Sequence, residues 1–508
     1  MKRRKCPSRK ENRACDSKIP AHGKGTQLVR LRTRPPRGKK VRFGVPDESL
    51  TGAGGVVVLA ELMRKLGVVR ALDAGIGAVK QRERGVSGGQ MVAALAQGQL
   101  LGGQNLAALD EQRLDVAAGR LSALPGLPST TAAGLARRFG ADQLAGVEAG
   151  AASVTARAFG MLPAQRRKAL CAGAVTIDMD CTDVEVYGRR KQGVAYNYQG
   201  QRVRRPHVAA WAEGGLVLAA DLMSGRDDVR PAAGQLLRRA LAALPVPVLA
   251  AARQGDRRVR VRADAGYFTA DLAWAALEAG CDFAIAAKRN KAAWRAYAAV
   301  PEDAWQPAKG MRGAFVAVLD YRPEGWPPET YTIVRRVRVD TADISADGRS
   351  RRRRTIPAEQ LALALGGQLD HVWAVSFIVT NIPTGGHEKF DSALDVEGWF
   401  RRRTDIEDRF KDAKLGAALR HLPSGHEAVN QVWMWAALLA VNLSVLLQAL
   451  TGIDEHGRAH CPRLRRELLC IPARVIRHAG RIEMRLPPGR QTLLPEVLAR
   501  LRELPTTA

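Results

Sequence analysis

The chain has 508 residues, 46% of them hydrophobic, which is enough for two or three domains with buried cores. Its net charge of +29 favours a polyanionic partner, because each Lys or Arg that neutralises a phosphate releases a bound counterion. Seven scattered cysteines without a Cys-x-x-Cys pair argue against a disulfide-rich secreted domain, and no apolar signal segment follows the basic start, so we expect a cytoplasmic protein.

The first segment, residues 1–48, is predicted to be a basic, disordered arm. Residues 1–45 hold sixteen Lys and Arg and two acidic residues, a net charge of +14, and few aromatic residues. The next segment, 49–168, has apolar residues at helical spacing and contains predicted helices at 56–66, 88–102, 129–139 and 141–159. The third of these ends in Arg137-Arg138, which suits either a DNA-contacting helix or a structural one, so we expect a helical DNA-binding or accessory domain.

From 169 to 288 the apolar pattern changes to a period of two, which is typical of strands. The stretch 174–180 alternates apolar side chains with Thr176, Asp178 and Asp180. Further strands are predicted at 207–212, 216–221, 259–264 and 283–288, with helices at 231–244 and 269–279. The predicted order is three strands, helix, strand, helix, strand, which indicates an α/β domain.

The segment 289–383 is predicted to be a β-rich insertion, with strands at 315–320, 331–339 and 373–380 and a very basic loop at 347–354. The segment 384–453 contains a charged helix, 399–415, and an apolar run, 432–450. We predict a buried core helix for this run and no membrane partner, because Asn442, Ser444 and Gln448 interrupt it. Residues 454–508 are predicted to be a basic, partly helical segment.

The charged helix carries one notable stripe. At about 100° per residue, Phe400, Arg403, Glu407 and Lys414 fall within a quarter of its circumference, so one carboxylate is flanked by two cations. An ordinary ladder of helical salt bridges explains the stripe equally well. Asp405, Asp408 and Asp412 fall on another face, for which we predict solvent exposure.

Three acidic positions are candidates for a metal site: Asp178 or Asp180 on the first strand, Asp264 at the end of the fourth, and Glu407 on the late helix. Carboxylates that converge from separate elements suit Mg²⁺, and two such ions can activate a hydroxyl and stabilise a leaving oxygen in phosphoryl transfer. Each acid alone is equally well explained as a cap of a turn or helix. Strand alternation does not choose between Asp178 and Asp180.

The motifs resemble those of a known family. The spacing Phe400-x2-Arg403-x3-Glu407-x6-Lys414 resembles the Y-x2-R-x3-E-x6-K signature of DDE transposases of bacterial insertion sequences. Asp180-Cys181-Thr182 resembles their D-x-T motif, and the residues from Asp264 to Phe268 resemble their second-aspartate motif. Within this group the chain is most similar, over about residues 45–490, to the insertion-sequence family labelled thirteen-eighty.

This resemblance implies a ribonuclease-H-like catalytic core, interrupted by a β-rich insertion before its last acidic helix. It implies two Mg²⁺ or Mn²⁺ ions, cleavage at the inverted-repeat ends of the element, and joining of the 3′-OH to target DNA. The D-x-T match favours Asp180 over Asp178, so the metal-binding acids carried over are Asp180, Asp264 and Glu407. Arg403 and Lys414 would hold phosphates. Phe400 replaces the family tyrosine and keeps its ring.

Further basic residues are candidate contacts to double-stranded DNA: Arg189, Arg190 and Lys191 after the first strand, and Arg351 and Arg352 in the insertion. Solvated loops explain these charges equally well. Pairing of two DNA ends predicts a homodimer on DNA, at the bacterial nucleoid. Two alternatives to a transposase are a metal-dependent nuclease that cuts without joining and a catalytically silent DNA-binding protein.

Overall fold

The computed structural model describes residues 41–80, 84–254, 259–348, 350, 353–385, 390–489 and 493–505. The predicted basic arm falls largely outside these residues. The chain divides into two compact units, Met1–Glu48 and Ser49–Ala508, and the elements described below belong to the second unit.

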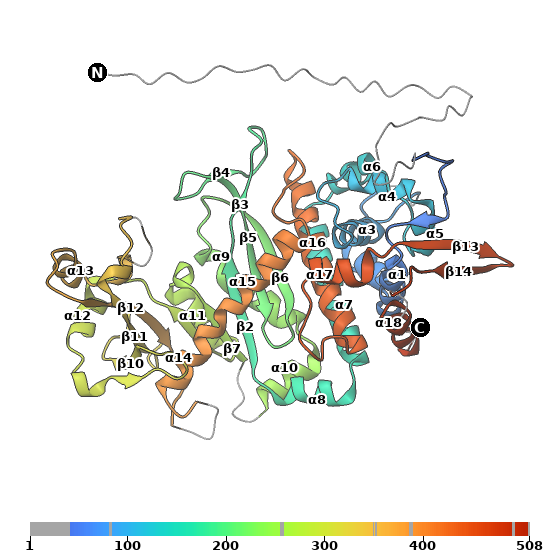
Figure 1. Ribbon diagram of the computed structural model, residues 1–508. Coiled ribbons are helices and arrows are strands. Elements are labelled where there is room, and N and C mark those ends of the chain that lie inside the picture. Colours follow the sequence, from blue (N-terminus) through green and yellow to red (C-terminus); the bar gives the residue numbers. More distant parts are fainter. Residues whose placement is uncertain are drawn as a thin grey trace, which may run out of the picture. The chain divides into compact units, whose positions relative to one another are not determined.

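The N-terminal part of this unit is helical, as predicted (Figure 1). One reason that two of its helices pack closely is a pair of glycines: a Cβ on Gly75 would lie 2.2 Å from the carbonyl oxygen of Gly146, so only glycine allows this approach. Ser87 and Gln90 form a capping box that starts a third helix. The helices are α1 (Val56–Leu66), α2 (Val68–Ile76), α3 (Gly88–Leu100), α4 (Ala108–Leu114), α5 (Val116–Leu121), α6 (Ser129–Ala136), α7 (Ala141–Met161) and α8 (Ala164–Ala172).

A mixed sheet follows, and β2 (Val175–Cys181) is the central strand of the five main strands that precede the insertion. On one side β2 pairs antiparallel with β5 (Arg202–Trp211), which pairs antiparallel with β6 (Leu216–Ser224). On its other side it pairs parallel with β7 (Val259–Ala263), which pairs parallel with β8 (Cys281–Ala286). The parallel connections run through helices, α9 (Arg230–Ala243), α10 (Val246–Arg253) and α11 (Ala270–Glu278). Two short strands, β3 (Val184–Glu185) and β4 (Ala195–Tyr196), also pair with β5.

The strands of the insertion continue this sheet. The strand β12 (His371–Thr380) pairs antiparallel with β8, and β11 (Tyr331–Asp340), β10 (Ala314–Leu319) and β9 (Gln306–Pro307) follow in order. Within the described residues this sheet has eleven strands. Two helices, α12 (Lys291–Ala298) and α13 (Ala358–Leu365), complete the insertion.

The helix predicted over 399–415 is confirmed in part: the chain is helical up to Gly416, but the helical run begins earlier, at Ala393, and contains a 3-10 turn and a π turn. The chain forms α14 (Ala393–Arg401), a 3-10 turn (Arg402–Thr404), α15 (Asp405–Lys411) and a π turn (Asp412–Gly416). The exposure predicted for Asp412 is wrong, because its carboxylate is buried and accepts a hydrogen bond from the backbone N–H of Cys461 at 2.8 Å. This long-range contact stabilises the π turn. A helical wheel assumes the same rotation for every residue and therefore does not represent such a turn.

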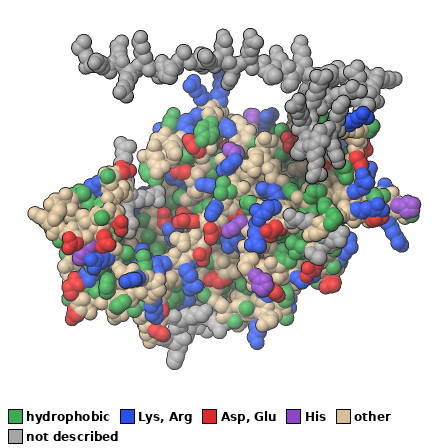
Figure 2. Space-filling model, in the orientation of Figure 1, with side chains coloured by type: hydrophobic (Ala, Val, Ile, Leu, Met, Phe, Trp, Pro, Cys, Tyr) green, Lys and Arg blue, Asp and Glu red, His purple; other side chains and the backbone are tan. Residues whose placement is uncertain are grey.

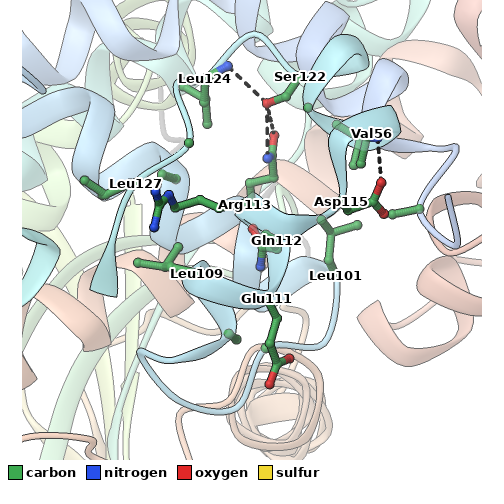
Figure 3. A pocket seen from close by; sticks show the side chains of 18 of the residues that line it. Val56, Leu101, Leu109, Glu111, Gln112, Arg113, Asp115, Ser122, Leu124 and Leu127 are labelled. Atoms are coloured by element: carbon green, nitrogen blue, oxygen red, sulfur yellow. Dashed lines mark hydrogen bonds between the residues drawn. The ribbon is translucent and has the colours of Figure 1, made fainter. Parts of the chain in front are cut away.

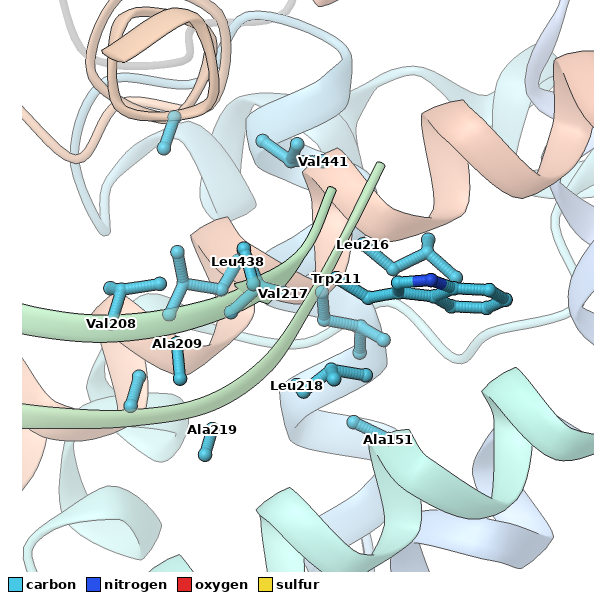
Figure 4. Packing of buried hydrophobic residues seen from close by; sticks show 14 of the residues in the cluster. Ala151, Val208, Ala209, Trp211, Leu216, Val217, Leu218, Ala219, Leu438 and Val441 are labelled. Atoms are coloured by element: carbon cyan, nitrogen blue, oxygen red, sulfur yellow. The ribbon is translucent and has the colours of Figure 1, made fainter. Parts of the chain in front are cut away.

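The apolar run forms α16 (Glu427–Thr451), a helix long and apolar enough to cross a membrane, whose apolar window is wholly buried inside the protein. It packs on β6, and α7 also contacts this strand; Figure 4 shows Leu438 of α16 beside Val217, and Ala151 of α7 on the side of Leu218. Asn442 bonds to the backbone of Val217, donating to its oxygen at 2.8 Å and accepting from its nitrogen at 2.9 Å. Asn442, one of the polar residues that interrupt the apolar run, is therefore hydrogen-bonded inside the protein.

The C-terminal segment returns to the N-terminal helices. It contains α17 (Cys461–Leu464), a π turn (Arg465–Leu469), the hairpin β13 (Ala473–His478) and β14 (Arg481–Arg485), and α18 (Leu493–Glu503). The strand β1 (Leu50–Thr51) pairs with β13, and α18 packs on α1. The hairpin was not predicted from the sequence.

Candidate active site

The two acids of the first strand have different partners. Asp178 is 1% exposed and forms a two-bonded ion pair with Arg262: Nε donates to Oδ1 at 2.6 Å and Nη2 donates to Oδ2 at 2.7 Å. A planar guanidinium matches a carboxylate in this geometry, so the charge of Asp178 is compensated inside the protein.

Arg262 also fastens the end of α14 to the sheet. Its Nη1 donates to the backbone oxygen of Trp399 at 2.6 Å, and its guanidinium carbon lies 5.0 Å from the centre of the Trp399 ring. The indole Nε1 of Trp399 donates in turn to Oγ1 of Thr176 on β2 at 3.2 Å. The turn that follows α14, which carries Arg403, is therefore anchored close to the central strand.

Asp180 meets Arg403 instead. Oδ2 of Asp180 accepts from Nη1 of Arg403 at 3.1 Å, and Oδ1 accepts from the backbone N–H of Cys181 at 2.8 Å. Burial raises the pKa of Asp180 to about 6; the charge of Asp264 raises it further, and Arg403 opposes both. Burial raises the pKa of Asp178 to about 6 as well, so what distinguishes Asp180 is the second carboxylate, Asp264, close to it.

Asp264 lies beside Asp180 because β2 and β7 are parallel neighbours. Met179 pairs with Ala263 in the register, so the two acids follow directly at the carboxyl ends of adjacent strands. Asp264 caps the 3-10 turn Ala265–Tyr267, where its Oδ1 accepts from the backbone N–H of Gly266 at 2.8 Å. This bond fixes the orientation of the carboxylate.

Glu407 is exposed on α15 and has no hydrogen bond or ion pair among the described residues. α15 packs against β2, which brings the helix to the strand of Asp180. Within the described part of the chain, no three His, Cys, Asp or Glu side chains lie close enough together to form a metal site. The structure therefore joins Asp180 to Asp264 and does not join Glu407 to them.

Lys414, in the π turn, binds the segment that follows β2. Its Nζ donates to Oγ1 of Thr182 at 2.6 Å and to the backbone oxygen of Asp183 at 2.8 Å. Burial lowers the pKa of Lys414. The lysine thus links the late helical segment to the strand end that carries Asp180.

Comparison with known protein families decides the class of this protein. The family model described as transposase DDE domain group 1 matches residues 33–506, nearly the whole chain. The chain belongs to this family.

One solved structure similar to this DDE transposase family member is the cryo-EM structure of a piggyBac transposase synaptic complex with hairpin DNA. The two share 10% sequence identity and a TM-score of 0.39, over 95% of this chain and 85% of that chain. No curated protein matches the chain.

The other predicted site residues of the transposase, where the structure describes them, form their contacts away from Asp180 and Asp264. Phe400 is partly buried and packs on a hydrophobic cluster that includes Ile333 and Ile378. Arg189 and Arg190 are exposed. Lys191 is half-buried, and its Nζ donates to the backbone oxygen of Leu422. Arg351 and Arg352 lie outside the described residues.

Sequence reasoning missed Arg262. A signal was present: Arg260 and Arg262 alternate with valines in a predicted buried strand, and a buried guanidinium requires an acidic or carbonyl partner. Thr182 was quoted only for its place in a motif, although its hydroxyl is the group that Lys414 binds.

A cavity of about 760 Å³ lies elsewhere in the transposase, among the N-terminal helices (Figure 3). Leu101, Leu109 and Leu127 contribute apolar walls, and Gln97 donates to Oγ of Ser122 at 3.3 Å. None of the candidate catalytic acids lines this cavity. It is therefore separate from the pair formed by Asp180 and Asp264.

Proposed function

We propose that this protein is a DNA transposase that cleaves the inverted-repeat ends of a bacterial insertion sequence and joins the 3′-OH ends to target DNA. The observation that carries the proposal is the pairing of Asp180 with Asp264 at neighbouring strand ends, with Arg403 bonded to Asp180. Membership of the transposase DDE domain family supports the same chemistry.

The strand order supports a ribonuclease-H-like core for this function. The order β6-β5-β2-β7-β8 combines an antiparallel meander with two parallel crossovers, and the insertion separates β8 from α14. Topology of this kind brings acids on the first and fourth strands together at one edge, because parallel strands end on the same side of a sheet.

Divalent metal fits the donor set at this edge. Asp180 and Asp264 would hold Mg²⁺ or Mn²⁺ through hard carboxylate oxygens, because they follow each other at the carboxyl ends of adjacent parallel strands. Glu407, on the helix that packs against β2, is the third acid we assign to the two-ion site. Metal held there would supply Lewis acidity for a water or a 3′-hydroxyl and for the leaving oxygen.

The chain's own residues would orient the DNA. Arg403 is one-fifth exposed at its side chain, so its guanidinium can contact a phosphate beside Asp180 while it remains in place. Lys414 holds Thr182 and Asp183 in position, and the excess of +29 attracts the DNA backbone. Because two ends must be joined in one reaction, we propose a homodimer on DNA in the bacterial cytoplasm.

A strand-transfer assay tests this function. The substrate is a labelled duplex of the inverted repeat that flanks the gene, with a plasmid target and Mg²⁺ or Mn²⁺. We expect the wild type to join the labelled 3′ end to the plasmid and Asp180→Asn to be inactive. Cleavage without joining would identify a nuclease, and binding without either reaction would identify a silent DNA-binding protein.

A second pair of variants tests Glu407. Glu407→Gln should abolish cleavage and leave DNA binding unchanged, whereas Asp408→Asn, an exposed acid next to it on α15, should keep full activity. If Glu407→Gln cleaves as fast as the wild type, Glu407 is not part of the site.

A further inference from the structure

The segment between β2 and β5, residues 182–201, exposes an unusual number of aromatic rings, and we name it the tyrosine loop. It carries three of the seven tyrosines of the chain, Tyr187, Tyr196 and Tyr198, which are 77%, 54% and 70% exposed. Arg189 and Arg190, also exposed, lie between the first and second of them. In Figure 1 the loop, with β3 and β4, projects beyond the upper end of the sheet. Figure 2 shows hydrophobic and basic side chains together at this end of the molecule.

The tyrosine loop is held in a defined conformation although its rings are exposed. Asn197, between two of the tyrosines, is buried, and its side chain accepts from the backbone N–H groups of Gln199 and Gln201 at 3.0 and 2.9 Å. Its Nδ2 donates to Oδ2 of Asp183 at 2.9 Å. Buried Arg204 donates to the backbone oxygen of Gln192 at 3.1 Å. Such internal bonds leave the aromatic faces available at little cost in conformational entropy.

The root of the tyrosine loop lies at the candidate active site. The loop begins at Thr182, two residues after Asp180, and Lys414 bonds both Thr182 and Asp183. On its far side, Lys191 bonds to Leu422, which follows the π turn. The exposed rings are therefore tied to the same elements that carry the catalytic acids.

We propose that the tyrosine loop binds unpaired nucleotides of DNA at the cleaved end, with bases stacked on its tyrosines and phosphates contacted by Arg189 and Arg190. This inference rests on the proposed function. A duplex hides the faces of its bases, so an exposed aromatic ring finds a stacking partner in DNA where bases are unpaired. Stacking tolerates any base sequence, and the arginines contact the backbone without reading sequence, which suits a flank that changes with each insertion.

Single-strand binding by the full-length protein tests the proposal without knowledge of the inverted repeat. The probes are a short fluorescent oligo-dT strand and a relaxed, covalently closed duplex circle, which has neither ends nor hairpin loops. The triple variant Tyr187→Leu, Tyr196→Leu, Tyr198→Leu should bind oligo-dT about tenfold or more weakly, and the duplex circle as the wild type does. The triple Tyr→Phe variant, which keeps the rings, should bind oligo-dT as the wild type does.

The other outcomes overturn the assignment. Unchanged oligo-dT affinity in the Leu variant, or an equal loss in the Phe and Leu variants, would show that the rings do not stack on bases. A changed oligomeric state with unchanged oligo-dT affinity would make the tyrosine loop an interface between copies. Thermal unfolding of each variant shows whether the fold is intact, and Arg189→Gln with Arg190→Gln should weaken both probes. Strand transfer by the wild type tests the proposed function separately. If the wild type joins DNA ends and the Leu variant still binds oligo-dT as the wild type does, only the assignment of the tyrosine loop is overturned.

Discussion

Arg403 donates from Nη1 to Oδ2 of Asp180 across 3.1 Å, and this bond joins the 3-10 turn after α14 to the end of the central strand. The same strand holds Asp178 two residues earlier, where Arg262 neutralises it. Each acid of β2 is thus bonded to a different arginine, and we propose that only Asp180 belongs to the catalytic site.

Asp180→Asn should lower the rates of cleavage and joining more than roughly hundredfold. Roughly tenfold to hundredfold losses are typical of residues that only hydrogen-bond to a metal ligand. The amide keeps the shape of the side chain but removes the charge that a metal requires. The measurement is a time course of both reactions with Mg²⁺. A variant with near-normal rates would remove Asp180 from the site.

Asp178→Ala should destabilise the fold by about 3–5 kcal/mol, because it leaves the buried guanidinium of Arg262 unpaired. The double variant Asp178→Leu with Arg262→Met should recover much of this loss, since it removes both charges. Urea unfolding at neutral pH measures both values. A loss no larger than that of an exposed ion pair, up to about 1 kcal/mol, would contradict the buried pair.

Mg²⁺ should raise the unfolding temperature of the wild type and leave that of Asp180→Asn unchanged. A ligand present at a hundred times its dissociation constant stabilises the folded state by about 2.7 kcal/mol. The control is an EDTA-treated sample of each protein. Equal shifts in the two proteins would indicate metal binding outside the pair formed by Asp180 and Asp264.

Arg403→Ala should weaken binding of a DNA end and reduce the slope of log affinity against log salt concentration by about one, because one phosphate contact is lost. Arg402→Ala, in the same turn, is the matched control for general charge. A slope equal to that of the wild type would limit Arg403 to its ion pair with Asp180.

His207 should make the fold sensitive to acid. Burial lowers the pKa of His207 from its usual 6.5 to about 4, and neither ring nitrogen has a hydrogen-bond partner among the described residues. The folded state therefore favours the neutral ring: this stability is complete above pH 6.5 and is lost as the pH falls towards about 4, by about 3 kcal/mol in total. His207→Phe should flatten the unfolding free energy over this range, measured by urea titration at several pH values. If the unfolding free energy of His207→Phe falls with pH as that of the wild type does, the acid sensitivity comes from other groups.

Individual helices and strands could be predicted from the sequence because their patterns lie within the segments themselves. Residues 56–66 form α1 with the predicted bounds, and the strand predicted at 174–180 differs from β2 by one residue at each end. Apolar periodicity and turn residues are sufficient for such segments. The order of the main strands and helices up to β8 was predicted in the same way, without the short strands β3 and β4 and the helix α10. The parallel pairing of β2 with β7, which brings Asp180 beside Asp264, is a feature of the sheet.

The helix over 399–415 was predicted as continuous because propensity describes each residue without its distant partners. Asp412 is buried by Cys461, and Arg262 holds Trp399; both contacts join residues far apart in the chain. Of the predicted stripe, Arg403 and Lys414 both contact the end of β2, through Asp180 and Thr182. Phe400 instead packs against a hydrophobic cluster, and Glu407 is exposed.

The sequence by itself determined the α/β class, the basic character and the small set of acids from which a site could be built, since these depend on composition and short-range pattern. Only the tertiary structure decided which acid of β2 forms the two-bonded ion pair with Arg262 and which lies beside Asp264. Alternation sends Asp178 and Asp180 to one face of the strand, and their partners differ because Arg262 reaches one and Arg403 the other. Charge compensation is a property of neighbours in space, which a linear pattern does not contain.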